Sequence, residues 1–135
     1  MIAGRGPIVG LVLLSHSPAL AEGLRDLVVQ MSRLPEAVAA AGGTGDGRLG
    51  TSPTVLEEAV GRVSGGGGVL VLADIGSAVL TARAWLAGYH GDERVLLGDA
   101  PLVEGAVAAG VLASTGASLD DVRAAAQQAW SVRKL

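Results

Sequence analysis

The chain has 135 residues, half of them hydrophobic, and its ten basic and thirteen acidic side chains give a formal net charge of −3. This length suits a single domain, while the slight acidity and the three aromatic residues argue against a nucleic-acid partner. The absence of cysteine excludes disulfides and thiolate chemistry, and no apolar run reaches the length of a membrane span, so we expect a cytoplasmic protein without a membrane partner.

The first elements follow from an apolar run and a helix-start signal. Residues 1–7 contain glycine and proline and are predicted to be a flexible leader. Residues 8–15 are apolar on both faces, which is typical of a central parallel strand. Ser17 and Pro18 supply a capping hydroxyl and then proline at the first helical position, and apolar residues recur at helical spacing as far as Met31.

A weaker second strand is predicted at residues 36–41, and a glycine-rich loop at 42–50 follows it. Ser52 and Pro53 repeat the helix-start signal and predict a helix through Val63. The loop contains the dinucleotide-binding pattern Gly-x-Gly-x-x-Gly, but the helix begins after the last glycine instead of within the glycine turn. We therefore interpret this segment as a flexible loop and not as a nucleotide site.

The second half of the chain continues the alternation of strands and helices. The predicted elements are a glycine turn at 65–68, strands at 69–73 and 95–97, and helices at 76–87, 101–113 and 118–131. No composition change marks a domain boundary within this stretch. We expect one domain over residues 8–131, followed by a short tail at 132–135.

This alternation predicts an α/β fold with a parallel sheet covered on both faces. Right-handed crossovers leave few topologies for four strands. The expected architecture is a doubly wound three-layer sandwich, with a mostly parallel four-stranded sheet of order 2-1-3-4 and helices on both faces.

Polar side chains follow the predicted strands, at the edge where ligands bind in such sheets. They are Ser15, His16 and Ser17 after the first strand, Thr51 and Ser52 beyond the second, Asp74 after the third and Asp99 after the fourth. The first and third strands flank the reversal point of the sheet. His16 and Asp74 are therefore expected on the two sides of the crevice.

The chemistry of His16 suits phosphoryl transfer. Neutral imidazole is a good nucleophile toward phosphorus, and its ordinary pKa of about 6.5 leaves much of it unprotonated near neutral pH. A carboxylate such as Asp74, bonded to one ring nitrogen, fixes the tautomer and directs the other nitrogen outward. The helix start directly after His16 offers free backbone amides to an anion.

Less specific interpretations stand beside this one. His16 is also consistent with a surface residue in a loop, and Asp74 with a helix cap. His90 precedes the fourth strand and is expected at the opposite edge as a solvated loop residue. The single lysine, Lys134, rules out a Walker A phosphate loop, and two distant histidines without suitably spaced ligands predict no metal site.

Four separated segments resemble a known family. VLLSHSPALAEG at 12–23 is similar to the phosphohistidine segment of the mannose-type IIA domains of the bacterial phosphotransferase system. LADIGSA at 72–78, APLVEG at 100–105 and GTSP at 50–53 resemble one branch of that group, the phosphotransferase subunit of the phosphoenolpyruvate-dependent dihydroxyacetone kinase. The similarity runs from about residue 8 to residue 130.

The resemblance implies a phosphoryl carrier and therefore a phosphotransferase. His16 would accept a phosphoryl group from the histidine phosphocarrier protein, hold it on Nε2, and pass it to ADP in the nucleotide-binding subunit of the kinase. Asp74 would orient the imidazole, and Ser17, Thr51 and Ser77 would contact the phosphoryl group. The family implies a homodimer, and it places ADP, ATP and Mg in the partner subunit, with no cofactor on this chain.

Some features depart from this pattern, and three other functions remain open. The leader is longer than the family needs, and the glycine loop leaves the second strand uncertain. The chain could instead be the IIA component of a mannose-type sugar transporter, a non-catalytic regulatory binding module, or a small nucleotide-dependent oxidoreductase.

Exposed apolar residues near His16 are expected to form a docking patch. The candidates are either Pro18, Ala19 and Leu20 or Ile75 and Leu102.

Overall fold

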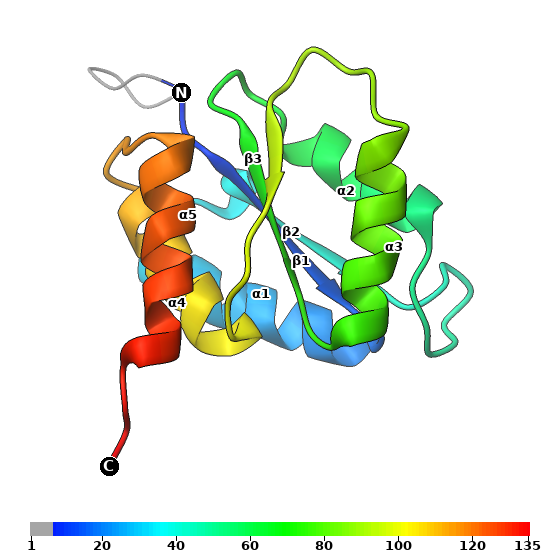
Figure 1. Cartoon of the computed structure of the whole chain (residues 1–135), viewed down its shortest axis with the longest axis horizontal. Coiled ribbons are helices and arrows are strands. Elements are labelled where there is room, and N and C mark those ends of the chain that lie inside the picture. Colours follow the sequence, from blue (N-terminus) through cyan, green and yellow to red (C-terminus); the bar gives the residue numbers. More distant parts are fainter. Residues whose placement is uncertain (1–6) are drawn as a thin grey trace.

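The computed structural model describes residues 7–135, so the predicted leader lies outside the described residues except for Pro7. Strands and helices alternate along the chain (Figure 1). The strands are β1 (Gly10–Ser15), β2 (Val38–Gly42), β3 (Val69–Ala73) and β4 (Val95–Leu97). The helices are α1 (Pro18–Ser32), α2 (Pro53–Val63), α3 (Gly76–Ala87), α4 (Leu102–Ala113) and α5 (Leu119–Gln128), with short 3-10 turns at Pro35–Ala37 and Ala129–Ser131.

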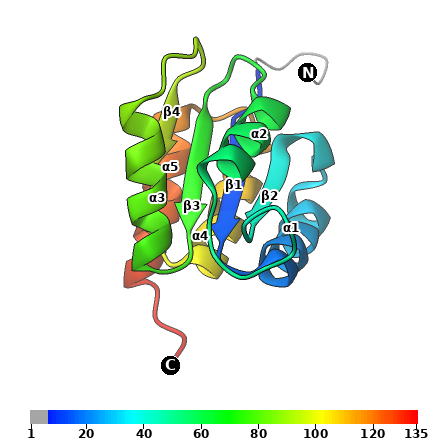
Figure 2. The same ribbon diagram turned by 90° about the vertical axis from the view of Figure 1, so that its right-hand side faces the viewer.

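The strands form one parallel sheet in the order β2-β1-β3-β4, which Figure 2 shows from one side. This confirms the predicted strand order. The chain moves outward from β1 to β2 and then returns to the other side of β1 to form β3. The reversal point therefore lies between the carboxyl ends of β1 and β3, where side chains from the two following loops meet.

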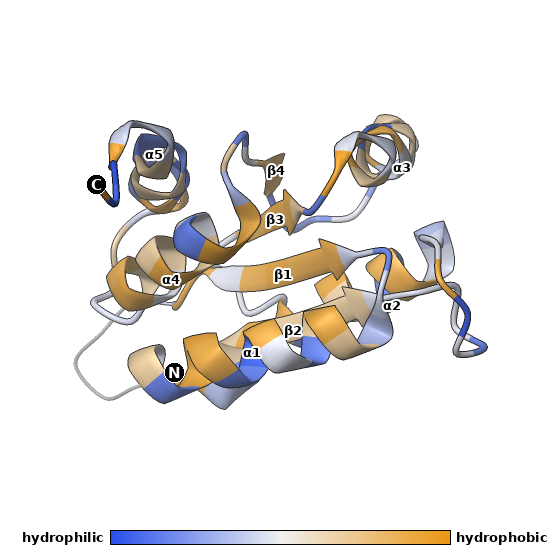
Figure 3. Cartoon of the chain, turned by 90° about the horizontal axis from the view of Figure 1, so that it is seen from below, coloured by the Kyte–Doolittle hydropathy of each residue, from blue (hydrophilic) through white to orange (hydrophobic). Residues whose placement is uncertain are grey.

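Helices cover both faces of the sheet. Apolar residues of α1, α4 and α5 pack on one face, and those of α2 and α3 pack on the other. Alternate residues of β1 enter the two cores: Leu11 and Leu13 face the first, and Val12 and Leu14 face the second. Figure 3 shows β1 and β3 as largely hydrophobic strands between these helix layers. The predicted doubly wound, three-layer α/β fold is confirmed.

Small residues allow the helices of one layer to approach closely. α1 and α4 meet at Gly110, where an added Cβ atom would lie 2.5 Å from Cγ1 of Val28. A side chain at this position would push the two helices apart. The fully buried residues of both cores are aliphatic, and the partly buried Trp85 packs against the second core. Without buried aromatic rings, the helices must approach closely to fill the interior.

Serine hydroxyls cap three of the helices, as the sequence predicts. Ser17 accepts a hydrogen bond from the backbone of Leu20 at 3.2 Å, and Ser52 accepts one from the backbone of Val55 at 3.3 Å. Ser118 caps α5 in the same way. These contacts satisfy amides that have no acceptor within their own helix.

The second strand differs from its predicted bounds of 36–41. It begins at Val38 and ends at Gly42, because residues 35–37 form a 3-10 turn. Arg25 of α1 donates hydrogen bonds to the carbonyl oxygens of Pro35 and Val38, at 2.8 and 2.7 Å. This tertiary contact covers the chain where the turn passes into the strand.

Within residues 7–135, no helix combines the length and the apolar character needed to cross a membrane.

Candidate functional site

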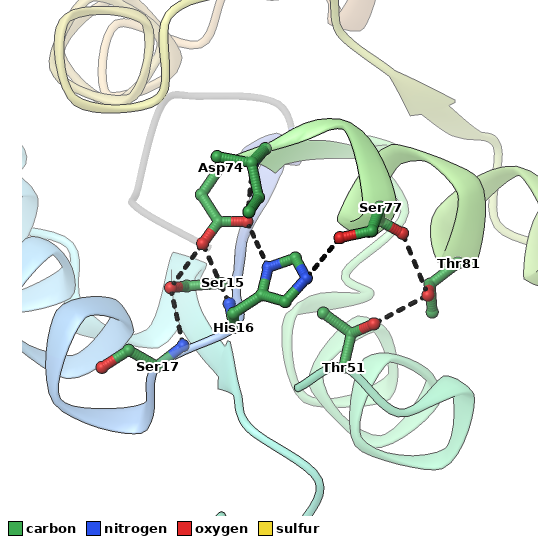
Figure 4. A network of polar contacts seen from close by, with 8 residues as sticks. Ser15, His16, Ser17, Thr51, Asp74, Ser77 and Thr81 are labelled. Carbon is green, nitrogen blue, oxygen red and sulfur yellow. Dashed lines mark hydrogen bonds and ion pairs between the residues drawn. The ribbon is translucent and has the colours of Figure 1, made fainter. Parts of the chain in front are cut away.

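His16 and Asp74 meet at the reversal point of the sheet (Figure 4). His16 directly follows β1, and Asp74 directly follows β3. Because the two strands are neighbours in register, residues that follow their carboxyl ends are held side by side. Nδ1 of His16 lies 2.9 Å from Oδ1 of Asp74. The structure thus brings together the two residues that the sequence singles out.

The Asp74 carboxylate accepts four hydrogen bonds. Oδ2 accepts from the backbone N–H of His16 at 2.9 Å and from the hydroxyl of Ser15 at 3.0 Å. Oδ1 accepts from the backbone N–H of Ile75 at 2.7 Å and from the His16 ring. Partial burial alone would raise the pKa of Asp74, but these hydrogen bonds, led by the backbone N–H of His16, outweigh it and hold the pKa below the ordinary value of 3.8. Asp74 is therefore ionised at neutral pH.

An ionised Asp74 decides which ring nitrogen of His16 carries the proton. A carboxylate can only accept, so Nδ1 must donate to it as N–H. In the neutral ring, Nε2 then keeps its lone pair and accepts a hydrogen bond from the Ser77 hydroxyl at 2.6 Å. The His16 side chain is 25% exposed. Its nucleophilic nitrogen thus lies at the rim of the fold, with the other nitrogen held by the carboxylate.

Ser15 is a buried member of the site, and the sequence interpretation gave it no role of its own. Its side chain is fully buried at the end of β1. Its hydroxyl donates to Asp74, and its oxygen accepts from the backbone N–H of Ser17 at 3.0 Å. A polar residue that ends an otherwise apolar strand is the signal by which the sequence could have revealed it.

Of the three predicted phosphoryl contacts, Ser77 contacts the His16 ring, whereas Ser17 follows His16 in the chain and caps α1. The Ser17 hydroxyl accepts from the first turn of α1, which uses an oxygen lone pair and not the hydroxyl proton. The Ser77 hydroxyl stands on the first turn of α3 and contacts Nε2 directly. Within the described residues no side chain caps the first turn of α3.

Thr51, the third predicted contact, is engaged elsewhere. Its hydroxyl pairs with that of Thr81 at 2.7 Å, and Thr81 in turn donates to the carbonyl oxygen of Ser77 at 3.3 Å. Thr51 is linked to the site through its neighbour Gly50, whose N–H donates to the carbonyl oxygen of His16 at 2.8 Å. The sequence analysis did not identify Thr81, because the sequence around a threonine within a helix does not indicate a hydrogen bond to a distant residue.

Other polar residues at this edge stay apart from His16. Asp99 accepts from the indole N–H of Trp130 through its backbone and side-chain oxygens. Both residues line a groove of about 350 Å³ that also includes Asp74 and Ile75. His90 lies between α3 and β4, at the amino end of β4 and so at the opposite edge, as expected.

The predicted docking patch requires one correction. Leu20 and Ile75 are exposed, by 45% and 60%, and so is Ala19. Leu102, however, is only 9% exposed, because it begins α4 with its side chain in the core. It therefore does not belong to an exposed patch.

The described residues contain no group of three or more histidine, cysteine, aspartate or glutamate side chains placed to hold a metal ion. The chemistry that the described residues offer at this edge is that of an imidazole, a carboxylate and hydroxyl groups.

Residues 10–123 match the family model EIIA-man, described as the PTS system fructose IIA component. The chain belongs to the EIIA-man family. The matched range includes His16, Asp74, Thr51 and Ser77, and the match confirms the resemblance stated from the sequence.

Several curated relatives place the chain within one branch of the EIIA-man family. The phosphoryl donor subunit DhaM of PEP-dependent dihydroxyacetone kinase 2 from Listeria innocua is 37% identical over 106 residues, which cover 77% of this chain and 85% of that protein. The corresponding DhaM subunit from Providencia stuartii is 38% identical over 132 residues, which cover 94% of this chain but 28% of that protein. The chain thus spans about a quarter of the longer relatives.

Solved structures agree with the EIIA-man fold. The protein of unknown function EF1359 superposes with a TM-score of 0.77 at 32% identity, over 90% of this chain and 94% of that one. A sigma-54 interaction domain protein from Enterococcus faecalis, 18% identical with a TM-score of 0.66, shares the fold.

Proposed function

We propose that this chain is the phosphoryl-carrying EIIA domain of a PEP-dependent dihydroxyacetone kinase and that Nε2 of His16 carries the phosphoryl group. The observation that carries the proposal is the hydrogen bond between Nδ1 and an ionised Asp74, which leaves the lone pair of Nε2 at the rim. The names of the DhaM relatives favour this function over that of a sugar-transporter component. Membership of the EIIA-man family also argues against the oxidoreductase alternative.

The proposed cycle consists of two phosphoryl transfers. In the first, the Nε2 lone pair attacks phosphorus on the phosphohistidine of a phosphocarrier protein, and the donor's nitrogen–phosphorus bond breaks as the new one forms. The ring of His16 then bears a positive charge, which the Asp74 carboxylate stabilises through the Nδ1–H bond. In the second, an oxygen of the terminal phosphate of ADP attacks the phosphorus, Nε2 recovers its lone pair, and ATP forms in the nucleotide-binding subunit.

The hydroxyl groups around His16 are proposed to hold the transferred group. Ser77 donates to Nε2 in the structure, so its hydroxyl must turn away when phosphorus bonds to that nitrogen. Once turned, it donates to a phosphoryl oxygen, together with Ser17 and the amides that begin α1 and α3, whereas the Thr51 hydroxyl stays bonded to Thr81. Catalysis of this kind depends mainly on positioning and on charge stabilisation.

The proposed partners are proteins, and the chain itself is proposed to bind no cofactor. The histidine phosphocarrier protein would be the donor, and the nucleotide-binding subunit, with ADP and Mg, the acceptor. Both must reach Nε2, so both would cover the exposed side chains of Leu20 and Ile75. A homodimer and a cytoplasmic location complete the proposal. The proposal concerns only the segment that this chain shares with the longer relatives.

A labelling experiment tests the proposal. The chain is incubated with phosphoenolpyruvate, enzyme I and the phosphocarrier protein, and its intact mass is measured before and after acid treatment. We expect a mass increase of one phosphoryl group that acid removes. His16→Gln should abolish it, whereas His90→Gln, the matched control at the opposite edge, should not.

Undiminished labelling of His16→Gln would exclude His16 as the carrier. Tight non-covalent binding of a ligand without any covalent phosphate on the wild-type chain would instead identify a regulatory binding module.

A further inference from the structure

A series of hydrogen bonds links His16, through Ser77 and Thr81 of α3, to Thr51, which precedes α2 (Figure 4). The Ser77 hydroxyl contacts Nε2, the carbonyl oxygen of Ser77 accepts from the Thr81 hydroxyl, and the Thr81 oxygen lies 2.7 Å from that of Thr51. Thr51 and Thr81 come from different segments, 30 residues apart. Their contact is therefore tertiary and not a product of local helix geometry.

The direction of each hydrogen bond in this series follows from counting protons. A threonine hydroxyl has one proton to donate. The carbonyl oxygen of Ser77 can only accept, so the Thr81 proton is directed to it. The bond between the two threonines then needs the proton of Thr51. Thr81 thus accepts from Thr51 and donates to the backbone of Ser77 at the same time.

Thr81 connects two segments that both touch His16. On one side, Thr51 follows Gly50, whose N–H donates to the carbonyl oxygen of His16 at 2.8 Å. On the other side, Ser77 presents its hydroxyl to the ring. The first turn of α3 has no side-chain cap within the described residues, so the Thr81 hydroxyl is one of the few side-chain contacts that hold this turn. Both threonine side chains are half-buried, which limits competition from water.

We propose that Thr81 is a positioning residue for the phosphoryl transfer at His16. It touches neither the ring nor the transferred group. It holds the first turn of α3 and the segment of Gly50 and Thr51 in fixed places on two sides of Nε2. The predicted effect of Thr81 on the rate of transfer rests on the proposed function. Its predicted effect on the Ser77–His16 contact does not depend on that function.

The decisive variant is Thr81→Val, which keeps the shape of the side chain and removes the hydroxyl. The ring-nitrogen NMR spectrum of the unphosphorylated protein should show a changed Nε2 chemical shift, because the Ser77 hydroxyl is no longer held in place. The substitution removes both hydrogen bonds of the Thr81 hydroxyl but acts on the ring only indirectly. The rate of phosphoryl transfer should therefore fall roughly 2- to 12-fold, the range that corresponds to the free energy of a single hydrogen bond. Thr81→Ser, which restores the hydroxyl, should recover both values.

Thr51→Val removes the hydrogen bond between the two threonines by changing the other partner. It replaces Thr81→Val as the test variant if Thr81→Val does not fold. The double variant should be no slower than Thr81→Val alone, because Thr81→Val already removes the one bond that the two threonines share. Thr115→Val is the matched control: Thr115 makes the same kind of hydroxyl-to-carbonyl bond, to Leu112 at 2.6 Å, and its hydroxyl has no tertiary hydrogen bond within residues 7–135. It should leave the Nε2 shift and the rate unchanged.

An unchanged Nε2 shift in folded Thr81→Val would overturn the proposal, whatever the rate. The proposal would also be overturned if the rate reduction in the double variant equalled the product of the reductions in Thr51→Val and Thr81→Val. If the wild-type chain carries no phosphoryl group, the proposed function fails, whereas the NMR comparison still decides whether Thr81 positions the ring's partner.

Discussion

At the scale of single residues, the site depends on one carboxylate that organises its surroundings. Asp74 accepts from the backbone and the ring of His16, and it thereby fixes both the loop after β1 and the tautomer of the ring. The pairing of His16 with Asp74 could be predicted, because both residues follow neighbouring strands. Ser15 could be placed at the same edge as the polar residue that ends the first strand, but its hydrogen bond to Asp74 could not be predicted, and no pattern in the sequence indicated the role of Thr81.

The lowered pKa of Asp74 predicts how stability depends on pH. A carboxyl group whose pKa is lower in the folded state stabilises the fold above its unfolded pKa, and this contribution is lost as pH falls through the folded pKa. Urea unfolding of the wild type and of Asp74→Asn should therefore show a stability difference that is constant above about pH 5 and narrows below about pH 4. A difference that stays constant from neutral to acidic pH would show that the Asp74 charge contributes nothing.

The same Asp74→Asn protein should remain folded but transfer phosphoryl groups roughly 10- to 100-fold more slowly, as is typical when the partner of a functional histidine is removed. The single-turnover rate from phosphorylated phosphocarrier protein is the measurement. An unchanged rate would reduce Asp74 to a structural cap.

Ser15→Ala should destabilise the protein by about 1–3 kcal/mol, because it leaves the backbone N–H of Ser17 without a partner next to the core and removes one of the two hydrogen bonds to Oδ2 of Asp74. Chemical denaturation measures this value. Ser131→Ala, which removes an exposed serine hydroxyl bonded to Gln128, is the control and should change stability by less than about 0.5 kcal/mol. Equal effects of the two substitutions would contradict the role given to Ser15.

At the scale of elements, local signals locate most helices and strands, and tertiary contacts account for the main discrepancy. The cap-and-proline pairs at Ser17 and Ser52 start their helices where the sequence predicts, because these signals act within a single turn. The start of β2 was displaced by two residues. Arg25, which lies ten or more residues earlier, donates to the carbonyl oxygens of Pro35, which begins the 3-10 turn, and Val38, which follows it, and no local pattern encodes that contact.

Arg25→Met keeps much of the aliphatic length and removes these two hydrogen bonds. It should cost about 1 kcal/mol of stability and should increase hydrogen exchange at the turn of residues 35–37 and at β2. Arg133→Met, on an exposed side chain near the C-terminus, should change neither. Normal exchange protection at β2 in Arg25→Met would show that the strand needs no support from α1.

At the scale of the whole molecule, the order of the strands assembles the site from distant segments. The fold class and the strand order follow from the alternating pattern, because right-handed crossovers leave few alternatives. His16 and Asp74 are 58 residues apart, and only the adjacency of β1 and β3 brings them together. The same adjacency accounts for the two cores, since each face of these central strands needs its own layer of helices.

The measurement that tests the central claim most directly is NMR of the His16 ring nitrogens before and after phosphorylation by phosphoenolpyruvate, enzyme I and phosphocarrier protein. Before phosphorylation, the spectrum should show the proton on Nδ1 and none on Nε2. Afterwards, Nε2 should couple to phosphorus while Nδ1 keeps its proton. Coupling of phosphorus to Nδ1, or a proton on Nε2 in the unmodified ring, would contradict the account.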